Sequence, residues 1–362
     1  YRKIFHPAIK PDFLYTKVAK SFPVAAKELT AYTLEGAKVT MFRKDDEIRP
    51  IYHILPAEYD LLEDEYIVLG QARETLAAHK PTQAEFVDPK HTREIFKSRG
   101  VDVAAEKIDL LSDILVRYTV GFGVIELILK DHKIQDLSIN SPVSMNQLTV
   151  IHADYGECLT NITITPRDVD SWATKFRLMS GRPLDESNPV LDTELLVPGS
   201  RSRVVVIQGP LSPSGLAFTF RRHRDKPWTL PLFVQNKMLT PLAAGLLSFF
   251  IDGGRTLLIA GTRSAGKTSL LSSLMIQILR SIRIITVEDT LELPVDELKR
   301  LSYDIQSLKV KSVITGGDQE IDAEEGIRTS LRMGDSSLIV GEVRSTEALA
   351  LYEAMRVGAL AN

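Results

Sequence analysis

The sequence predicts a mixed α/β protein of two or three domains. The chain has 362 residues, of which 44% are apolar, and this is enough material for more than one core. From Thr240 onward, helical and strand-like segments alternate, which is typical of an α/β domain. Between residues 105 and 224, strands and helices are mixed, which favours a compact α+β domain.

Composition excludes several classes of protein. The formal net charge of -3 argues against a protein that coats nucleic acid over its whole surface. A single cysteine, Cys158, excludes a disulfide framework and a four-cysteine zinc site, and it favours a reducing compartment. No apolar run approaches the roughly 18 residues of a spanning helix, and the start YRKIFHPAIKPDF lacks a secretory signal. We therefore expect a cytoplasmic protein with peripheral membrane contact at most, whose native N-terminus precedes Tyr1.

Residues 1–104 carry the weakest pattern. Two strand-like pieces, Lys38–Arg43 and Ile51–Ile54, precede helical periodicity over Ala57–His79 and Asp88–Ser98. We expect a small N-terminal α/β domain here.

Residues 105–224 carry a clearer pattern, which begins with helical spacing over Val101–Tyr118 and a break at Gly121 and Gly123. The helix expected over Thr165–Gly181 has a good start and a good stop. A loop rich in Pro and Asp follows it. The expected strands are Ile134–Ile139, Leu148–Ala153, Arg203–Gln208 and Leu216–Arg221.

A polar segment, Arg222–Leu239, is expected to link this domain to the next, with residues 225–239 as the linker proper. Trp228, Pro231 and Phe233 are its candidate docking anchors. Thr240–Pro241 then predicts a helix start.

A phosphate-binding loop is the strongest motif. Arg255–Ala260 (RTLLIA) predicts a buried strand, and it leads into G-x-x-x-x-G-K-T and then into helical spacing over Lys267–Leu279. Small residues let backbone N–H groups face phosphates, and the helix N-terminus adds positive potential. We expect Lys267 to reach the β- and γ-phosphates and the Thr268 hydroxyl to ligate Mg²⁺. The expected nucleotide-binding residues are Gly261, Thr262, Arg263, Ser264, Ala265, Gly266, Lys267, Thr268 and Ser269.

Two downstream strands are expected to end in acids: Arg283–Asp289, which ends in Glu288 and Asp289, and Ser337–Glu342. Acids at strand ends beside such a loop face the γ-phosphate and its metal. We assign Glu342 to the hydrolytic water; the alternative is that it only holds magnesium or pairs with Arg344. Glu288 is a catalytic candidate, and Asp289 and Glu342 are metal candidates beside Thr268. The alternative for Glu288 and Asp289 is that they satisfy nearby helix N–H groups.

These segments together resemble the hexameric ATPases of the type II/type IV secretion superfamily, of the general secretion pathway E type. GTRSAGKT is similar to the family's Walker A, RIITVEDTLEL to its acidic box and SSLIVGEVR to its Walker B. RTSLRMGD resembles the arginine-bearing stretch before that Walker B, and GVIELILKDHKIQDLSIN the start of the second N-terminal domain. EAMRVGALAN points to the archaeal branch.

The resemblance implies a RecA-like P-loop ATPase domain over residues 240–362 and a PAS-like domain over 105–224. It also implies ATP and Mg²⁺ as ligands, a ring of six subunits and an integral membrane platform protein as partner. The family's histidine-bearing box and helical C-terminal subdomain are expected after Asn362, so we expect the RecA-like domain to be incomplete here.

The resemblance further implies that arginines of the N-terminal half reach the nucleotide. The candidates are Arg201, Arg203, Arg221, Arg222 and Arg224, with Arg203 and Arg221 foremost. The alternative is a solvated basic patch. The lone histidines His152 and His223 are more often packed or solvated than ligands, and we assign neither.

The function expected is an ATP hydrolase that drives pilin or protein export through a membrane partner. Two alternatives remain open at this point: a nucleic-acid motor, for which Arg221–Arg224 would contact phosphates, and a nucleotide-gated module that hardly turns over.

Overall fold

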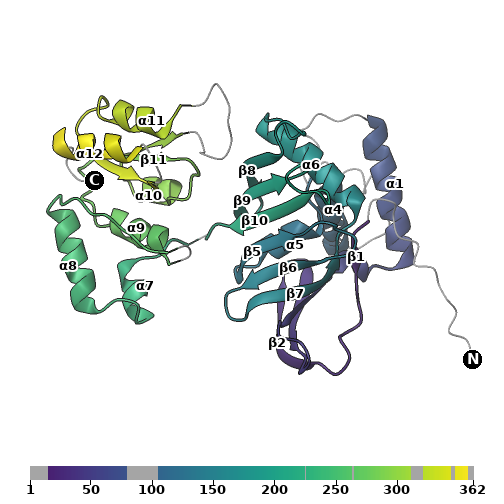
Figure 1. The fold of residues 1–362 in the computed structure, drawn as a ribbon. Coiled ribbons are helices and arrows are strands. Elements are labelled where there is room, and N and C mark those ends of the chain that lie inside the picture. Colours follow the sequence, from purple (N-terminus) through teal and green to yellow (C-terminus); the bar gives the residue numbers. More distant parts are fainter. Residues whose placement is uncertain are drawn as a thin grey trace, which may run out of the picture. The chain divides into compact units, whose positions relative to one another are not determined.

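The computed structural model describes residues 15–79, 105–224, 226–262, 265–310, 321–343 and 347–357. They form two compact units, Tyr1–His223 and Arg224–Asn362 (Figure 1). The predicted helix Asp88–Ser98 lies outside the described residues. Among the described helices, none has both the length and the apolar content needed to cross a membrane.

The first unit is built on one large sheet, with the strand order β2-β3-β4-β7-β6-β5-β10-β9-β8 and with β1 added beside β7. All its pairings are antiparallel except β4 with β7. The strands are β1 (Lys17–Val18), β2 (Lys27–Leu34), β3 (Ala37–Arg43), β4 (Ile51–Pro56), β5 (Ile134–Ile139), β6 (Gln147–His152), β7 (Gly156–Thr163), β8 (Val190–Val197), β9 (Ser200–Ile207) and β10 (Ala217–Arg222).

The helices described beside this sheet are α1 (Glu63–His79, after the short 3₁₀ turn η1 at Ala57–Tyr59), α4 (Ala105–Thr119), α5 (Val124–Lys130) and α6 (Pro166–Ser180). The main core joins α5 and α6 to residues from strands on both sides of β7. Helices α1 and α4 pack on each other in a second cluster.

Helix α6 confirms its predicted limits because both ends carry local signals. The Thr165 hydroxyl and the Asp168 carboxylate form a reciprocal capping box, and Gly181 closes the helix in the left-handed conformation. The prediction of a loop rich in Pro and Asp after α6 was wrong in part, since this segment contains β8. Its apolar residues stand in two blocks on either side of the polar run Asp192–Glu194, so the segment lacks the simple alternation that would have predicted a strand.

The seam between β4 and β7 depends on a side chain. The ladder there has two residue pairs, Ile51 with Leu159 and Tyr52 with Thr160. Beyond it, the buried Asn161 carboxamide accepts from Ile54 N–H (2.9 Å) and donates to the carbonyls of Ile54 (2.8 Å) and Ala19 (2.9 Å). The boundary that we expect between residues 104 and 105 stays a prediction, but residues 15–79 and 105–223 share this sheet and its core.

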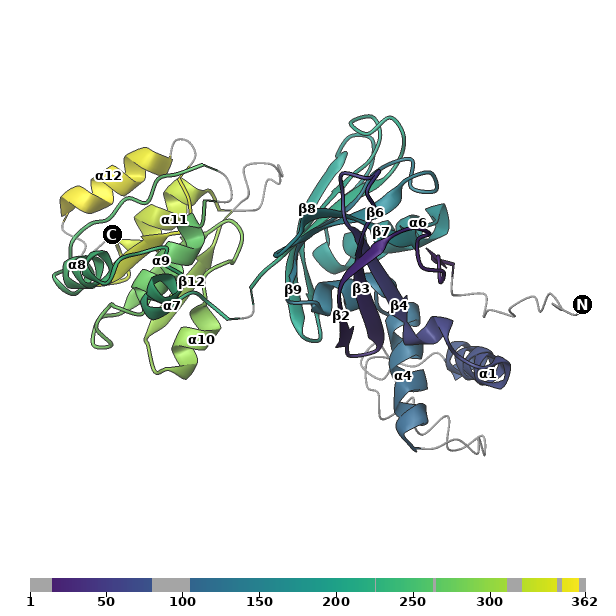
Figure 2. The same ribbon diagram turned by 90° about the horizontal axis from the view of Figure 1, so that it is seen from below.

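The second unit is a three-layer α/β arrangement (Figure 2). A parallel sheet with the order β12-β11-β13 has α9 and α10 on one face and α11 and α12 on the other. Every residue of β11 is buried, as expected of a central parallel strand. The elements are α7 (Leu230–Gln235), α8 (Pro241–Asp252), α9 (Lys267–Met275), β11 (Ile284–Glu288), α10 (Val295–Arg300), β12 (Ile305–Lys309), α11 (Ala323–Ser330), β13 (Ser337–Val340) and α12 (Glu347–Val357).

The strand predicted over Arg255–Ala260 was wrong, because this segment is irregular. Leu257 and Ile259 pack against the cluster formed by α7, α8 and α9, while Leu258 is 73% exposed. The segment is thus only partly buried, whereas a buried strand was expected, and a strand also needs a neighbour for its backbone groups. In the described part of the second unit, the ladders join only β11, β12 and β13.

The Asn161 bridge generates a test of the seam. Replacing Asn161→Leu leaves the backbone groups of Ile54 buried without that carboxamide, so we expect the free energy of unfolding to fall by about 3 kcal/mol. Denaturant unfolding measures this. Asn146→Ala, which removes an exposed carboxamide, should change it by less than about 0.5 kcal/mol. Equal effects of the two substitutions would contradict the role given to Asn161.

Candidate nucleotide-binding site

The turn into α9 sets the geometry of the glycine-rich loop. Gly266 has φ 86° and ψ 19°, a left-handed conformation, and α9 begins at the next residue, Lys267. The first N–H of the helix to bond back is that of Leu270, to Gly266 O at 2.9 Å. The N–H groups of residues 267–269 therefore have no acceptor within the helix, which is the property that anion binding at a helix N-terminus uses.

The loop consists of small, solvent-exposed residues, and the side chain of Lys267 bonds back to its backbone. Gly261, Thr262 and Ala265 are exposed, and Lys267 Nζ donates to Thr262 O at 2.8 Å. Arg263 and Ser264 lie outside the described residues. Thr268 and Ser269 follow, half-buried, in the first turn of α9. A phosphate that enters the loop meets an ammonium group already positioned there.

Helix α9 runs against the direction of the strands. Tyr303 Oη donates to Ile276 O at 2.7 Å, so the end of α9 lies where the chain enters β12. Leu271 and Met275 pack in the same cluster as Ile284 at the start of β11. A helix that packs along parallel strands and ends where they begin starts toward the edge where they end. The N-terminus of α9 thus faces the edge that carries the acids.

The ends of β11 and β13 lie side by side at that edge. Gly341 N–H donates to Val287 O at 2.9 Å. A Cβ on Gly341 would lie 2.9 Å from Glu288 Cγ, so the glycine makes room for the glutamate. Glu342 follows as an exposed residue, and Arg344, its alternative partner, lies outside the described residues.

The Glu288 carboxylate organises the acidic segment. Glu288 is 3% exposed, and its Oε1 accepts from the N–H groups of Glu292 (2.8 Å) and Leu293 (2.9 Å). Asp289 Oδ1 accepts from Thr290 N–H at 2.6 Å. These N–H groups belong to the loop that precedes α10, whereas the alternative expected helix N–H groups. The catalytic role of Glu288 remains a prediction.

The oxygen atoms available fit Mg²⁺ that is held mainly by phosphates and water. Among the described residues, no group of three or more His, Cys, Asp and Glu side chains could hold a metal ion. Thr268, Asp289 and Glu342 would supply hydroxyl and carboxylate oxygens at the edge where the strands end. Mg²⁺ in nucleotide sites commonly takes one or two protein oxygens and leaves the rest to the substrate.

The foremost arginine candidates stand in one row across the first unit. Register pairs join Asp136 of β5 to Arg221 of β10, Arg221 to Arg203 of β9, and Arg203 to Glu194 of β8. Paired residues project from the same face of a sheet, so this face carries a charged strip in which two arginines lie between two acids. Arg201 extends it, with Nη2 2.8 Å from a Glu194 carboxylate oxygen.

Arg203 and Arg221 differ in how firmly they are held. Arg203 makes two bonds to Asp192, from Nε at 3.0 Å and from Nη2 at 2.5 Å, and the two side chains are 13% and 6% exposed. Arg221 Nε donates to Asp136 at 3.0 Å, and the Arg221 side chain is 42% exposed. Arg221 is therefore the more accessible guanidinium of the two.

The other two arginine candidates have local partners. Arg222 donates from Nε to Leu129 O at 2.7 Å and contacts His132. Arg224, in the second unit, lies over the Trp228 ring, 4.5 Å from its centroid. Trp228 in turn packs on Phe233, so the expected docking anchors belong to the second unit.

His223 adjoins the strip. Its N–H donates to Arg201 O, and its buried Nε2 has no hydrogen-bond partner in the described structure. Burial, with the charge of Arg201 adding to it, lowers the pKa of His223 to about 4. The imidazole is therefore neutral at physiological pH, and it adds no charge to the strip.

The sequence did not reveal the carboxylates that hold the arginines. Asp192 and Glu194 lie in the segment taken for a loop. The apolar and β-branched residues of VLDTELLV were the available signal, because a strand there beside Arg203–Gln208 would pair acids with arginines.

Comparisons with known proteins find similarity over the C-terminal part of the chain. Residues 196–361 match the family model described as "Type II/IV secretion system protein". A protein of Methanocaldococcus jannaschii is 26% identical over 73% of this chain and 46% of its own length. The conjugal transfer protein TrbB of Rhizobium radiobacter is 28% identical over 48% of this chain and 50% of its own. The ATPase DotB of Legionella pneumophila, a solved structure, is 17% identical with a TM-score of 0.41, over 62% of this chain and 60% of that one. The chain thus spans about half the length of the curated relatives that it matches.

The contact of Gly341 with Glu288 generates a test of the acidic edge. In Gly341→Ala, the methyl group displaces Glu288, so we expect a loss of about 1–3 kcal/mol in unfolding free energy and weaker ATP binding. Thermal unfolding and equilibrium binding of ATP measure the two effects. The control is Gly245→Ala, at a helical position with open space, which should be neutral or stabilising. If Gly341→Ala behaves like its control, the packing of Gly341 on Glu288 does not matter.

Proposed function

We propose that this chain is an ATP hydrolase of the type II/IV secretion system family, to which residues 196–361 belong. The observation that carries the proposal is the start of α9. A left-handed glycine opens the helix behind a glycine-rich loop, and the loop contains Lys267. The acids at the ends of β11 and β13 support it.

In this proposal the β- and γ-phosphates of ATP lie against the loop and the N-terminus of α9. The N–H groups of the first turn donate to phosphate oxygens, and Lys267 exchanges its bond to Thr262 O for bonds to phosphate. The residues that fit Mg²⁺ are Thr268, Asp289 and Glu342, and the ion would neutralise phosphate charge when bound. Glu342 orients the attacking water by accepting its hydrogen bond.

We assign the guanidinium that completes the site to Arg221. Charge develops on the γ-phosphate oxygens in the transition state, and an arginine of the same or a neighbouring subunit can neutralise it. Arg221 has the exposure for this task, whereas Arg203 would have to leave a buried pair with Asp192. Arg203 then positions β8 and β9.

Coupling of hydrolysis to movement is proposed to use the short connection between the units. The expected linker over 225–239 is structured from Trp228 onward, because Thr229 caps α7 and Leu230 packs with Ala244 and Leu274. The hinge is therefore narrower than the linker, between His223 and Trp228. Six subunits in a ring would use this movement to drive pilin or protein export through a membrane platform protein, from the inner face of the cytoplasmic membrane.

The basic run Arg221–Arg224 does not favour a nucleic-acid motor. Arg221 is paired with Asp136, Arg222 bonds to a backbone carbonyl, and Arg224 stacks on Trp228. With Arg222 and Arg224 held locally, the half-exposed Arg221 is one cation, whereas a nucleic-acid stripe uses several phosphate contacts. The second alternative, a nucleotide-gated module without turnover, is distinguished from an ATP hydrolase by measuring turnover.

The first test is Glu342→Gln in a concentration series of the full-length protein. We expect wild-type turnover per subunit to rise with concentration, and the variant to lose at least about 100-fold in kcat with KM little changed. The control is Glu325→Gln, an exposed position on α11. Wild-type turnover that is absent, or that survives in Glu342→Gln, would support the nucleotide-gated module instead.

The second test separates the two arginines. Arg221→Ala should lower kcat by about 100-fold or more while the melting temperature stays the same, because a half-exposed pair adds little stability. Arg203→Ala should instead lower the free energy of unfolding, by up to about 3 kcal/mol, since Asp192 stays buried without its guanidinium. The reverse pattern would move the catalytic role to Arg203.

A further inference from the structure

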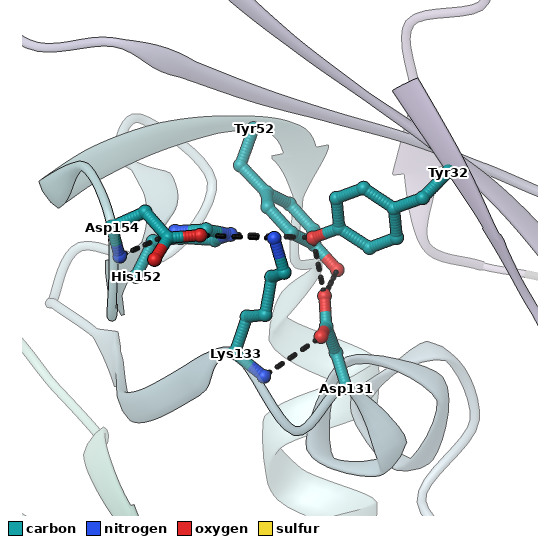
Figure 3. A network of polar contacts seen from close by, with 6 residues as sticks. All are labelled: Tyr32, Tyr52, Asp131, Lys133, His152 and Asp154. Atoms are coloured by element: carbon teal, nitrogen blue, oxygen red, sulfur yellow. Dashed lines mark hydrogen bonds and ion pairs between the residues drawn. The ribbon is translucent and has the colours of Figure 1, made fainter. Parts of the chain in front are cut away.

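A network of titratable side chains ties the N-terminal strands to the middle of the first unit (Figure 3). Asp131, which follows α5, is its centre. Asp131 Oδ2 accepts from Tyr32 of β2 at 2.7 Å and from Tyr52 of β4 at 3.0 Å. Its Oδ1 accepts from Lys133 N–H at 2.9 Å. Tyr32 and Tyr52 are 99 and 79 residues from Asp131, so these bonds join distant parts of the chain.

His152, the last residue of β6, connects this network to the β6–β7 turn. Its Nδ1 accepts from Asp154 N–H at 3.1 Å, and its Nε2 lies 3.3 Å from Tyr32 Oη. Because Nδ1 accepts, the neutral ring carries its proton on Nε2. That proton goes to Tyr32 Oη, and the tyrosine in turn donates to Asp131. The hydrogen bonds thus run in one direction, from the turn to the carboxylate.

The groups that face His152 come from every neighbouring element. Tyr32 comes from β2, Tyr52 from β4, Asp131 and Lys133 from the α5–β5 connection, and Asp154 and Tyr155 from the β6–β7 turn. Lys133 Nζ donates to Asp154 at 2.9 Å. Burial is the main cause that lowers the pKa of His152, and Lys133 adds to it, while Asp131 and Asp154 oppose it. His152 is 1% exposed.

Protonation of His152 breaks this arrangement. A proton on Nδ1 turns the acceptor into a donor that faces the Asp154 N–H donor at 3.1 Å. Either the turn or the ring must move. A moving ring loses its contact with Tyr32 of β2. Among the described strands, β2 lies at the edge of the sheet and pairs with β3 alone.

We propose that His152 is an acid-sensitive latch that holds edge strand β2 through Tyr32, and that its protonation loosens β2 and the β6–β7 turn. All members of the latch lie in the first unit. It makes the fit of residues 27–34 on the sheet a function of pH.

The direction of the pH dependence follows from the pKa. Because the pKa of His152 in the fold lies below its ordinary value of about 6.5, the unfolded chain binds a proton first. The stabilisation is therefore complete above about pH 6.5. It is lost as pH falls from there through the lower pKa of the folded state.

Hydrogen exchange of the full chain between pH 7.5 and 5, corrected for intrinsic rates, tests the latch. We expect protection of β2 and of the β6–β7 turn to fall about tenfold for each unit by which folding lowers the pKa, while β10 stays protected. His152→Asn keeps an acceptor for Asp154 N–H but does not titrate, so it should show no such step. His132→Asn, at an exposed histidine beside Lys133, should keep the wild-type step.

A second variant guards against a His152→Asn protein that fails to fold. Tyr32→Phe should lower protection of β2 already at pH 7.5 and should remove its acid step, while the turn keeps its own step. A wild-type protein without the step at β2 would overturn the proposal. So would a His152→Asn variant with an unchanged step.

Discussion

The left-handed backbone of Gly266 is the constraint on which the proposed site depends. A residue with a Cβ adopts this conformation only with strain, so the glycine fixes the point at which the loop turns into α9. The position of that turn decides which N–H groups lack acceptors and where Lys267 begins its reach. The same edge of the sheet uses a second glycine, Gly341, to admit the Glu288 side chain. Backbone clearance at two positions therefore orders both halves of the site.

In the first unit, arginine charges are neutralised by carboxylates on neighbouring strands of the same sheet. Arg201, Arg203 and Arg221 each meet a carboxylate from a neighbouring strand. An exposed pair orients the guanidinium but adds little to the stability of the fold. Breaking a buried pair is strongly destabilising, because it leaves a charge buried without its partner. Exposure thus separates the half-exposed Arg221 from Arg203, whose pair with Asp192 is nearly buried. The Asp131 network uses neutral tyrosines in the same way to join distant strands.

Sequence reasoning succeeded where the signal was local. The caps at Thr165, Gly181 and Thr240 and the start of α9 were all predictable from neighbouring residues. It failed where a partner from elsewhere decides the outcome. Strand β8 forms through its pairing with β9, which its own residues did not predict. Arg255–Ala260 has the composition of a strand, but it forms no ladder among the described residues. Likewise, the hydrogen bonds that Glu288 accepts from loop N–H groups depend on the fold and could not be predicted from the sequence.

The central claim is that the loop before α9 binds the phosphates of ATP. Equilibrium binding of a fluorescent ATP analogue in the presence of Mg²⁺, displaced by ATP and by adenosine, tests it most directly in wild type and Lys267→Ala. We expect ATP, but not adenosine, to displace the analogue from the wild-type protein. The affinity of Lys267→Ala for the analogue should be at least about tenfold weaker, because a charge-assisted bond to phosphate is lost. Equal affinity of the two proteins would contradict the central claim.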